Sequence, residues 1–170
     1  MAFRFANIVT LAAIVTGACL SPALGQSVRI LGEHNAWSAY ATTESAGQIC
    51  FVLSRPTATE PTPAGFTEAY FYITHRPTQG VRAEINLVAG YQFAPESTAT
   101  LTVGSQDFEL FTQDDAAWMA DPVESATAVQ AIRAGSTMSV TGTSADGQSV
   151  RQTFSLSGAT AAGRSMDGAC

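Results

Sequence analysis

Two cysteines carry the most reactive side chains in the part of the chain that we expect to fold. The sequence holds three cysteines in all, namely Cys19, Cys50 and Cys170. Cys19 lies in an N-terminal segment that we expect to be removed on export, which leaves two thiols in an oxidising compartment. We therefore predict a Cys50–Cys170 disulfide, whose loop of about 120 residues is worth about 5 kcal/mol in the chain-entropy model. The alternative is two free thiols, and two cysteines so far apart do not form a metal-binding motif.

The two histidines do not stand in a pattern typical of catalysis. A nucleophile–base pair needs a histidine beside a serine or cysteine. His75 shares a strand face with Phe71 and Ile73, which favours a hydrogen-bonded position in or near the core, and His34 lies in a polar turn beside Glu33. The G-x-S-x-G motif is absent from the sequence. A small hydrolase is therefore the less favoured alternative, and it requires one histidine within reach of a serine or carboxylate in a pocket.

The acidic residues do not indicate a metal or cofactor site. Asp114-Asp115 is the densest acidic point, and a solvated turn is the simpler explanation for it. Paired carboxylates for glycoside hydrolysis stay open from sequence alone, although the acids fall on strand faces that we expect to be wet. No glycine-rich phosphate loop precedes a helix. We predict no catalytic residue, no metal ligand and no cofactor.

Aromatic side chains offer one candidate binding surface. Tyr70 and Tyr72 share one face of a strand, and Tyr91 and Phe93 follow in a connector. With Trp118 they would line a site for a small ligand, a glycan or a protein partner. The competing interpretation, which we favour from the sequence, is that these rings form a second core layer.

The N-terminus has the pattern of a signal peptide over residues 1–25. Arg4 precedes an apolar run from residue 8 to residue 18, and Ala23-Leu24-Gly25 is a small-x-small cleavage site. The run is short for a membrane span. An uncleaved buried helix and a lipoprotein anchored through Cys19 are the two alternatives. The mature chain, residues 26–170, has the length of a single domain.

The charge of the mature chain excludes two classes of partner. The mature chain contains seven arginines, no lysine and fourteen acidic residues, which gives a net charge of about −7. A phosphate backbone and an anionic lipid surface both need clustered cations. We therefore expect no nucleic-acid partner and no membrane span in the mature chain.

Short alternating segments predict an all-β fold. The segment 48–54 is apolar on both faces, with Cys50 and Val52 opposite Ile49, Phe51 and Leu53, which predicts a central strand covered on both sides. Further alternating runs at regular spacing give about eight or nine antiparallel strands. The pattern is typical of a β-sandwich, with a closed barrel as the second choice.

One helix is predicted over residues 122–134. Asp121 can cap it, Pro122 suits its first turn and Gly135 ends it. Val123, Ala126, Val129 and Ile132 form a narrow apolar stripe on it. The C-terminal segment 158–167 is rich in small residues, and we expect one loose helical turn. Such a tail has little apolar area, so we expect reduction of the disulfide to free it first.

Several short motifs in a fixed order are similar to one protein family. They are Trp37-Ser38-Ala39, Cys50-Phe51-Val52-Leu53-Ser54 with Pro56, Thr74-His75-Arg76-Pro77, Gly90-Tyr91-Gln92-Phe93, Phe108-Glu109-Leu110-Phe111-Thr112, Ala117-Trp118, Ala131-Ile132-Arg133-Ala134-Gly135, Met138-Ser139-Val140, Gly142-Thr143-Ser144, and Phe154-Ser155-Leu156-Ser157-Gly158-Ala159 with Ala161-Ala162. In order and spacing the chain resembles the invasion-associated locus B family of exported bacterial proteins. The resemblance covers nearly the whole mature chain.

The resemblance implies an immunoglobulin-like β-sandwich that is exported to the periplasm or beyond. It also implies a link, in some pathogens, to entry into host cells, and it implies no catalytic residues. We therefore expect a non-enzymatic protein with an envelope or host-interaction role, whose partner is an unknown envelope or host protein. The alternative is a small ligand- or glycan-binding module.

Overall fold

The computed structural model describes residues 27–170, so the predicted signal peptide lies outside the described residues. Eleven strands form one antiparallel sheet in the order β1-β2-β3-β5-β6-β9-β8-β7-β10-β11-β4. The strands are β1 (Arg29–His34), β2 (Trp37–Glu44), β3 (Gly47–Ser54), β4 (Ala58–Glu60), β5 (Tyr70–Arg76), β6 (Val81–Val88), β7 (Thr98–Val103), β8 (Gln106–Gln113), β9 (Ala116–Trp118), β10 (Thr137–Thr143) and β11 (Ser149–Ser155). The helices are η1 (Pro77–Gln79), α1 (Pro122–Ala134) and α2 (Ala159–Ala169). The all-β, sandwich-like class predicted from the sequence is confirmed.

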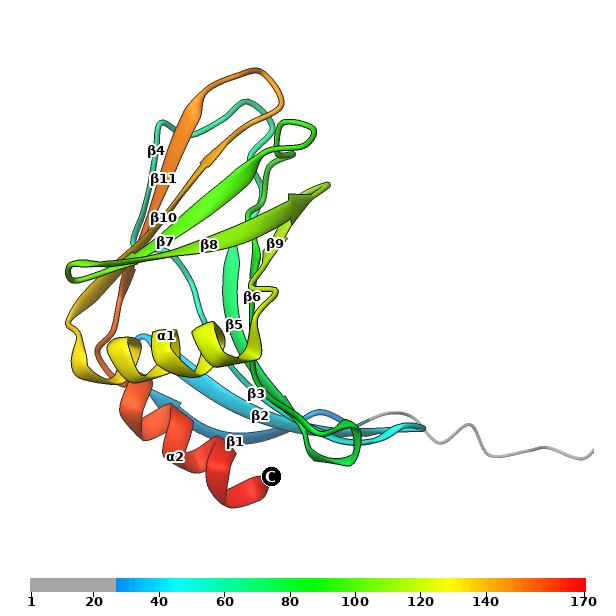
Figure 1. Cartoon of the computed structure of the whole chain (residues 1–170). Coiled ribbons are helices and arrows are strands. Elements are labelled where there is room, and N and C mark those ends of the chain that lie inside the picture. Colours follow the sequence, from blue (N-terminus) through cyan, green and yellow to red (C-terminus); the bar gives the residue numbers. More distant parts are fainter. Residues whose placement is uncertain (1–26) are drawn as a thin grey trace, which may run out of the picture.

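The sheet folds over into two layers that enclose the core (Figure 1). One layer holds β1, β2, β3, β5 and β6, and the other holds β8, β7, β10, β11 and β4, with the short strand β9 pairing with both β6 and β8. Rings meet between the layers, since the centroid of Phe71 on β5 lies 5.7 Å from that of Phe154 on β11. Trp37 adds an edge contact with Phe71 at 6.2 Å.

The strand count is larger than predicted because two strands are very short. β4 lies within residues 57–65, whose two prolines and glycine predict a loop, and β9 lies before the helix. Each has only three residues, and three residues do not establish an alternating pattern. Both strands form only because longer partners, β11 for β4 and β6 and β8 for β9, provide a ladder.

Helix α1 has the predicted boundaries but a different buried face. The Asp121 side chain accepts a hydrogen bond from the Val123 backbone N–H at 2.7 Å, and Gly135 ends the helix. The buried residues are Ser125, Ala128, Val129 and Ile132. The predicted stripe is therefore wrong at Val123, which is 74% exposed, and at Ala126, which is exposed as well. The small side chains of Ser125 and Ala128 face the protein instead, and the first helical turn leaves Val123 in solvent.

The expected loose C-terminal turn is wrong, because residues 159–169 form an eleven-residue helix. Its buried residues, Ala159, Ala162, Gly163 and Met166, recur at the spacing of one helical face. This face packs against β1, β2 and β3. Glycine lowers helix propensity, so the sequence argued for a weak turn, but docking of this small-residue face outweighs that cost.

The β3 strand is covered on one side rather than on both. Cys50 and Val52 are buried in the core at 0% and 1% exposure. Ile49, Phe51 and Leu53 point to the opposite face and remain half-buried. No helix or strand among residues 27–170 covers this outer face, so the sequence-based prediction of two covered faces is wrong.

The helices of residues 27–170 do not include one that is both long enough and apolar enough to cross a membrane.

Candidate functional site

Six aromatic side chains lie together on the outer, solvent-facing side of the sheet. They are Tyr40 on β2, Phe51 on β3, Tyr70 and Tyr72 on β5, Phe111 on β8 and Trp118 on β9. We refer to these six residues as the aromatic face. The core residues of the same strands alternate with them and point to the other side.

Strand register brings residues from distant parts of the sequence into one row. Tyr72 pairs with Asn86 on β6, Asn86 pairs with Trp118, and Trp118 pairs with Phe111. Directly paired residues in antiparallel strands point to the same side of the sheet. The row therefore runs across four neighbouring strands and joins β5 to β8.

The rings contact one another along the face. Tyr40 stacks on Phe51 with centroids 5.2 Å apart, and Phe51 lies 6.1 Å from Tyr72. Tyr70 and Tyr72 are also 6.1 Å apart. Such cross-strand aromatic contacts stabilise a sheet, yet the six rings remain partly open to solvent.

At the other end of the row, Phe111 and Trp118 form a second stacked pair. Their centroids are 5.4 Å apart and their planes differ by 21°. Phe111 is 47% exposed, one of the most exposed large hydrophobic side chains among residues 27–170. A groove of about 460 Å³ lies beside this pair, lined by Glu84, Phe111, Gln113, Trp118, Met119 and Ala120.

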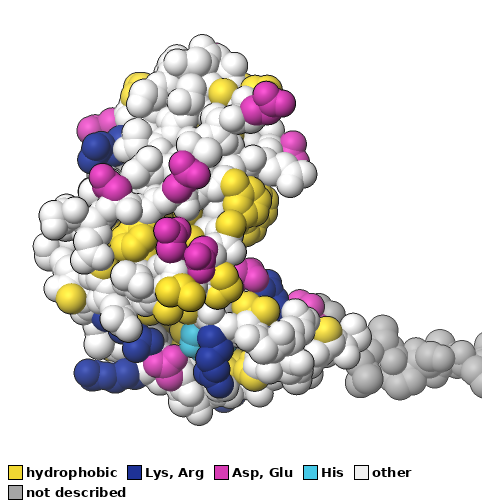
Figure 2. All heavy atoms as spheres, in the orientation of Figure 1, with side chains coloured by type: hydrophobic (Ala, Val, Ile, Leu, Met, Phe, Trp, Pro, Cys, Tyr) yellow, Lys and Arg dark blue, Asp and Glu magenta, His cyan; other side chains and the backbone are white. Residues whose placement is uncertain are grey.

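The molecule is concave on this side. An arm formed by the ends of β2, β3, β5 and β6 bends away from the body of the sandwich (Figure 1). In the space-filling view, hydrophobic side chains are visible where the arm meets the body (Figure 2). A partner that approaches this side can therefore contact the face from more than one direction.

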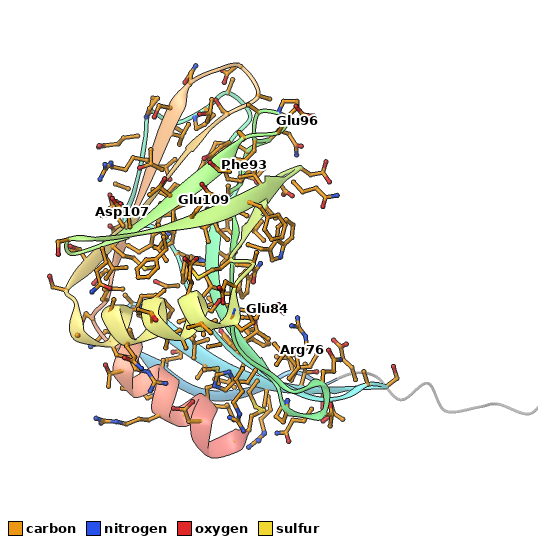
Figure 3. All side chains as sticks on the ribbon, viewed as in Figure 1. Arg76, Glu84, Phe93, Glu96, Asp107 and Glu109 are labelled. Atoms are coloured by element: carbon orange, nitrogen blue, oxygen red, sulfur yellow. A yellow bond between two sulfur atoms is a disulfide. The ribbon has the colours of Figure 1, made fainter. Side chains whose placement is uncertain are left out.

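The charges beside the face are paired with one another. Arg76 and Glu84 form an ion pair at 2.5 Å, and both lie at the base of the arm (Figure 3). Arg55 lies 3.7 Å from Glu68 and stacks over the Tyr70 ring at 5.1 Å from its centroid. The aromatic face is therefore apolar, and these charged side chains beside it are paired with opposite charges rather than gathered into a cluster of like charge.

The tyrosines of β5 titrate above the ordinary range. The hydrogen bond that the Tyr70 hydroxyl donates to Glu68 raises the pKa of Tyr70. Partial burial raises the pKa of Tyr72, with smaller effects from Tyr70 and Tyr40. Both phenols are therefore neutral hydrogen-bonding groups at physiological pH.

Three of the four residues predicted as a binding surface lie on this face, and one does not. Tyr70, Tyr72 and Trp118 belong to it, which contradicts the second core layer that we favoured for the tyrosines of β5. Tyr91 is only 7% exposed and packs on Phe93 at 4.9 Å inside the core. Burial raises the pKa of Tyr91 to about 12. Tyr91 is separate because the connector after β6 turns inward at the loop end of the sandwich.

Tyr91 borders a different hollow at that loop end. The hollow has a volume of about 440 Å³ and is lined by Pro63, Ala64, Gly65, Thr67, Gly90, Tyr91, Gln92, Asp115, Ser144, Ala145 and Asp146. Asp114 and Asp115 form the turn between β8 and β9, as the sequence indicated. Residues 27–170 contain no group of three or more His, Cys, Asp or Glu side chains that could hold a metal ion.

Sequence reasoning missed Tyr40, Phe51 and Phe111 as members of the face. The sequence predicts a covered layer for Phe51, and Phe111 falls at the end of an alternating run of residues. A signal was present: each of the three occupies a strand position opposite to the core residues. Only the strand order shows that these positions adjoin one another.

The histidines fasten helix α2 to the sheet. His75 Nδ1 accepts the backbone N–H of Ala83 at 3.0 Å, so its Nε2 carries the proton that is donated to Asp167 at 3.1 Å. His34 Nε2 and Ser165 Oγ are 2.9 Å apart. Each histidine thus has the kind of partner that the hydrolase alternative requires. However, neither pair lines the groove or the loop-end hollow, and Ser165 and Asp167 bond to different histidines.

The predicted disulfide is present and lies on the covered side of β3. Cys50 and Cys170 are bonded at 1.98 Å with their Cα atoms 6.0 Å apart. Gln48 Nε2 donates to the Ala169 carbonyl at 2.9 Å beside it. The bond fixes the end of α2 to the strand whose other side carries Phe51.

Comparison with known proteins gives one family and one fold. A family model described as "Invasion associated locus B (IalB) protein" matches residues 37–167. A solved structure, the invasion associated protein B of Bartonella henselae, is similar with a TM-score of 0.58 and 15% sequence identity, over 81% of this chain and 96% of that chain. At that identity the likeness establishes the fold alone. A search of curated proteins finds no match.

Proposed function

Since the chain belongs to the invasion-associated locus B family, we propose that it is an exported, non-enzymatic protein that binds an envelope or host component through the aromatic face. It acts in the periplasm or outside the cell. The observation that carries this proposal is a group of six aromatic side chains that remain at least partly exposed on the outer side of the sheet, opposite the core.

Several features support a binding role for the face. Contiguous apolar patches of a few hundred Å² are frequently interaction sites on monomeric proteins. Tyrosine, tryptophan and arginine are the residues that most often dominate binding energy at interfaces. Tyr70, Tyr72, Trp118 and Arg55 supply these three types at one surface.

Two features support an extracytoplasmic location. The Cys50–Cys170 bond belongs in an oxidising compartment. The pattern of residues 1–25 is typical of a signal peptide. Fractionation of cells that produce the full chain tests this part, and a mature protein found in the cytosol would overturn it.

A pull-down from envelope and host-cell surface fractions tests the binding part. The mature protein is the bait, and a Tyr72→Ala/Trp118→Ala double variant is compared with Val123→Ala, which removes a hydrophobic side chain that is 74% exposed on α1. We expect the double variant to lose the components that the wild type and Val123→Ala retain. Equal recovery by all three proteins would refute the aromatic face as the binding site.

A further inference from the structure

Within the aromatic face, Tyr72 and Trp118 stand on either side of a short side chain. Asn86 lies between them in the row, on the intervening strand. Phe111 covers the side of Trp118 that faces β8, with the two planes only 21° apart. The other side of the indole therefore faces over Asn86 towards Tyr72. We refer to Tyr72, Asn86 and Trp118 together as the slot.

Two strand spacings separate the walls of the slot. Adjacent strands are about 4.8 Å apart, so side chains on β5 and β9 start about 10 Å apart across β6. A ring in van der Waals contact with both walls needs about 3.5–4 Å on each side, or about 7–8 Å in all. Asn86 is partly exposed, and its amide offers both a donor and an acceptor.

The chemistry of this slot selects for a ligand with apolar faces and a polar edge. A hexopyranose ring has this form, because its axial C–H bonds make flat apolar faces and its hydroxyl groups lie around the rim. The indole of Trp118 and the ring of Tyr72 suit the faces, and the Asn86 amide and the Tyr72 hydroxyl suit the rim. We propose, building on the binding function above, that the slot holds a sugar unit of a neutral glycan chain of the bacterial envelope.

The surrounding charges favour a neutral chain over an acidic one. The arginines next to the face are both engaged, Arg76 with Glu84 and Arg55 with Glu68 and Tyr70. Glu84 also lines the groove beside Trp118. The protein as a whole is acidic, so a polyanionic glycan would be repelled at long range.

The size of the patch argues against a second copy of this chain as the occupant. A standard stable interface buries about 800 Å² on each partner. Five of the six rings of the aromatic face are partly buried, which leaves an exposed apolar area on the order of a few hundred Å². A ligand that inserts one ring and lies along the row uses such a surface more fully.

Trp118 reports directly on occupancy of the slot. The other tryptophan, Trp37, is 1% exposed, and its indole N–H donates to the Ser155 carbonyl. Titration of the mature protein with chitohexaose and with maltohexaose should therefore change the emission of Trp118 saturably. Calorimetry of the same mixtures gives the affinity independently of the fluorescent group.

The variants separate the slot from the rest of the face. We expect Tyr72→Ala and Asn86→Ala each to weaken binding of the neutral hexasaccharide by at least tenfold, while Val123→Ala leaves it unchanged. Circular dichroism and melting temperature show whether each variant is folded. If Tyr72→Ala is unfolded, Tyr72→Leu, which keeps an apolar wall without an aromatic ring or hydroxyl, replaces it with the same expectation.

Three results would overturn the assignment. The first is calorimetry without saturable binding of either neutral hexasaccharide. The second is binding that survives Asn86→Ala and Tyr72→Ala. The third is binding of one of two other sugars alone. Binding of only lacto-N-tetraose, a neutral host-type sugar, would place the ligand outside the bacterial envelope, and binding of only a heparin hexasaccharide would make the ligand acidic. If a protein from the pull-down is lost with the double variant while no sugar binds, the proposed function stands and the glycan assignment falls.

Discussion

Removal of the disulfide by Cys170→Ser tests how helix α2 is held. The bond joins residues 120 positions apart, for which the chain-entropy model gives about 5 kcal/mol, and measured losses of native disulfides are typically about 2–5 kcal/mol. For a domain of this size, each kcal/mol shifts the melting temperature by about 2–4 °C. We therefore expect the melting temperature to fall by roughly 10 °C.

The other contacts of α2 determine what the variant looks like before it melts. The carboxylate of Asp167 accepts hydrogen bonds from His75 at 3.1 Å and from Arg133 at 2.9 Å. Met166 is 1% exposed, so its side chain is fully packed. Because these contacts survive the substitution, we expect α2 to stay docked on average and to open locally more often than the sheet does.

Two assays measure the two parts of this prediction. Denaturant unfolding and thermal melting give the loss of stability, with Arg164→Ala, on the exposed side of the same helix, as the matched control. Hydrogen exchange gives the local opening, and we expect the amides of residues 159–169 to exchange faster while those of β5 and β6 remain protected. Cys50→Ser should cost at least as much stability, because it also puts a hydroxyl into a site with 0% exposure.

The reasoning fails if Cys170→Ser melts within about 2 °C of the wild type, since the smallest expected loss of about 2 kcal/mol shifts the midpoint by more than that. It also fails if non-reduced peptides from the exported protein contain two free thiols by mass spectrometry. Exchange that accelerates equally in α2 and in the sheet would contradict local opening and indicate that the disulfide supports the whole domain.

Three further perturbations have expected outcomes. Desolvation alone would raise the pKa of Asp167, but the hydrogen bonds from His75 and Arg133 and the charge of Arg133 outweigh it and lower that pKa. The contribution of Asp167 to stability is therefore present at neutral pH and is lost as the pH falls below about 4. Asp167→Asn should flatten the acid limb of melting temperature against pH, and an unchanged limb contradicts this. Gly158→Ala should lower the free energy of unfolding, measured in urea, by more than about 2 kcal/mol, because Gly158 has φ of 95° and a Cβ there would overlap the carbonyl oxygen of His34. A variant with the same urea midpoint as the wild type would show that the turn can shift to accept the Cβ. Asp121→Ala should cost about 1 kcal/mol in urea unfolding through loss of the α1 cap, and a loss below about 0.3 kcal/mol would mean that water replaces it.

The local patterns of the sequence were sufficient for the elements with strong boundaries. The limits of α1 followed from Asp121, Pro122 and Gly135, whose preferences act within one turn of the helix. Long strands such as β6 followed from strict alternation. The disulfide followed from the number of cysteines left after the expected cleavage, because two thiols in an oxidising compartment have only each other as partners.

The helix α2 could not be predicted from local preferences. Its segment contains Gly163 and Gly168, which lower helix propensity, and its apolar stripe consists mostly of small residues. Burial of this stripe against β1, β2 and β3 supplies the missing free energy. The surface that receives it is built from residues more than 100 positions earlier, so no window of sequence around α2 contains the information.

The candidate site depends on both local sequence pattern and tertiary structure, and the two contributions can be told apart. The sequence by itself determined that β3 has two apolar faces and that the chain is rich in tyrosine and phenylalanine near β5. It did not determine which face would be covered: Tyr91 is buried and Tyr72 is partly exposed, although both are tyrosines with aromatic neighbours in the sequence. Tertiary structure decided this, because exposure depends on the order in which strands pair, and pairing placed Tyr72, Asn86 and Trp118 side by side with no element above them in residues 27–170.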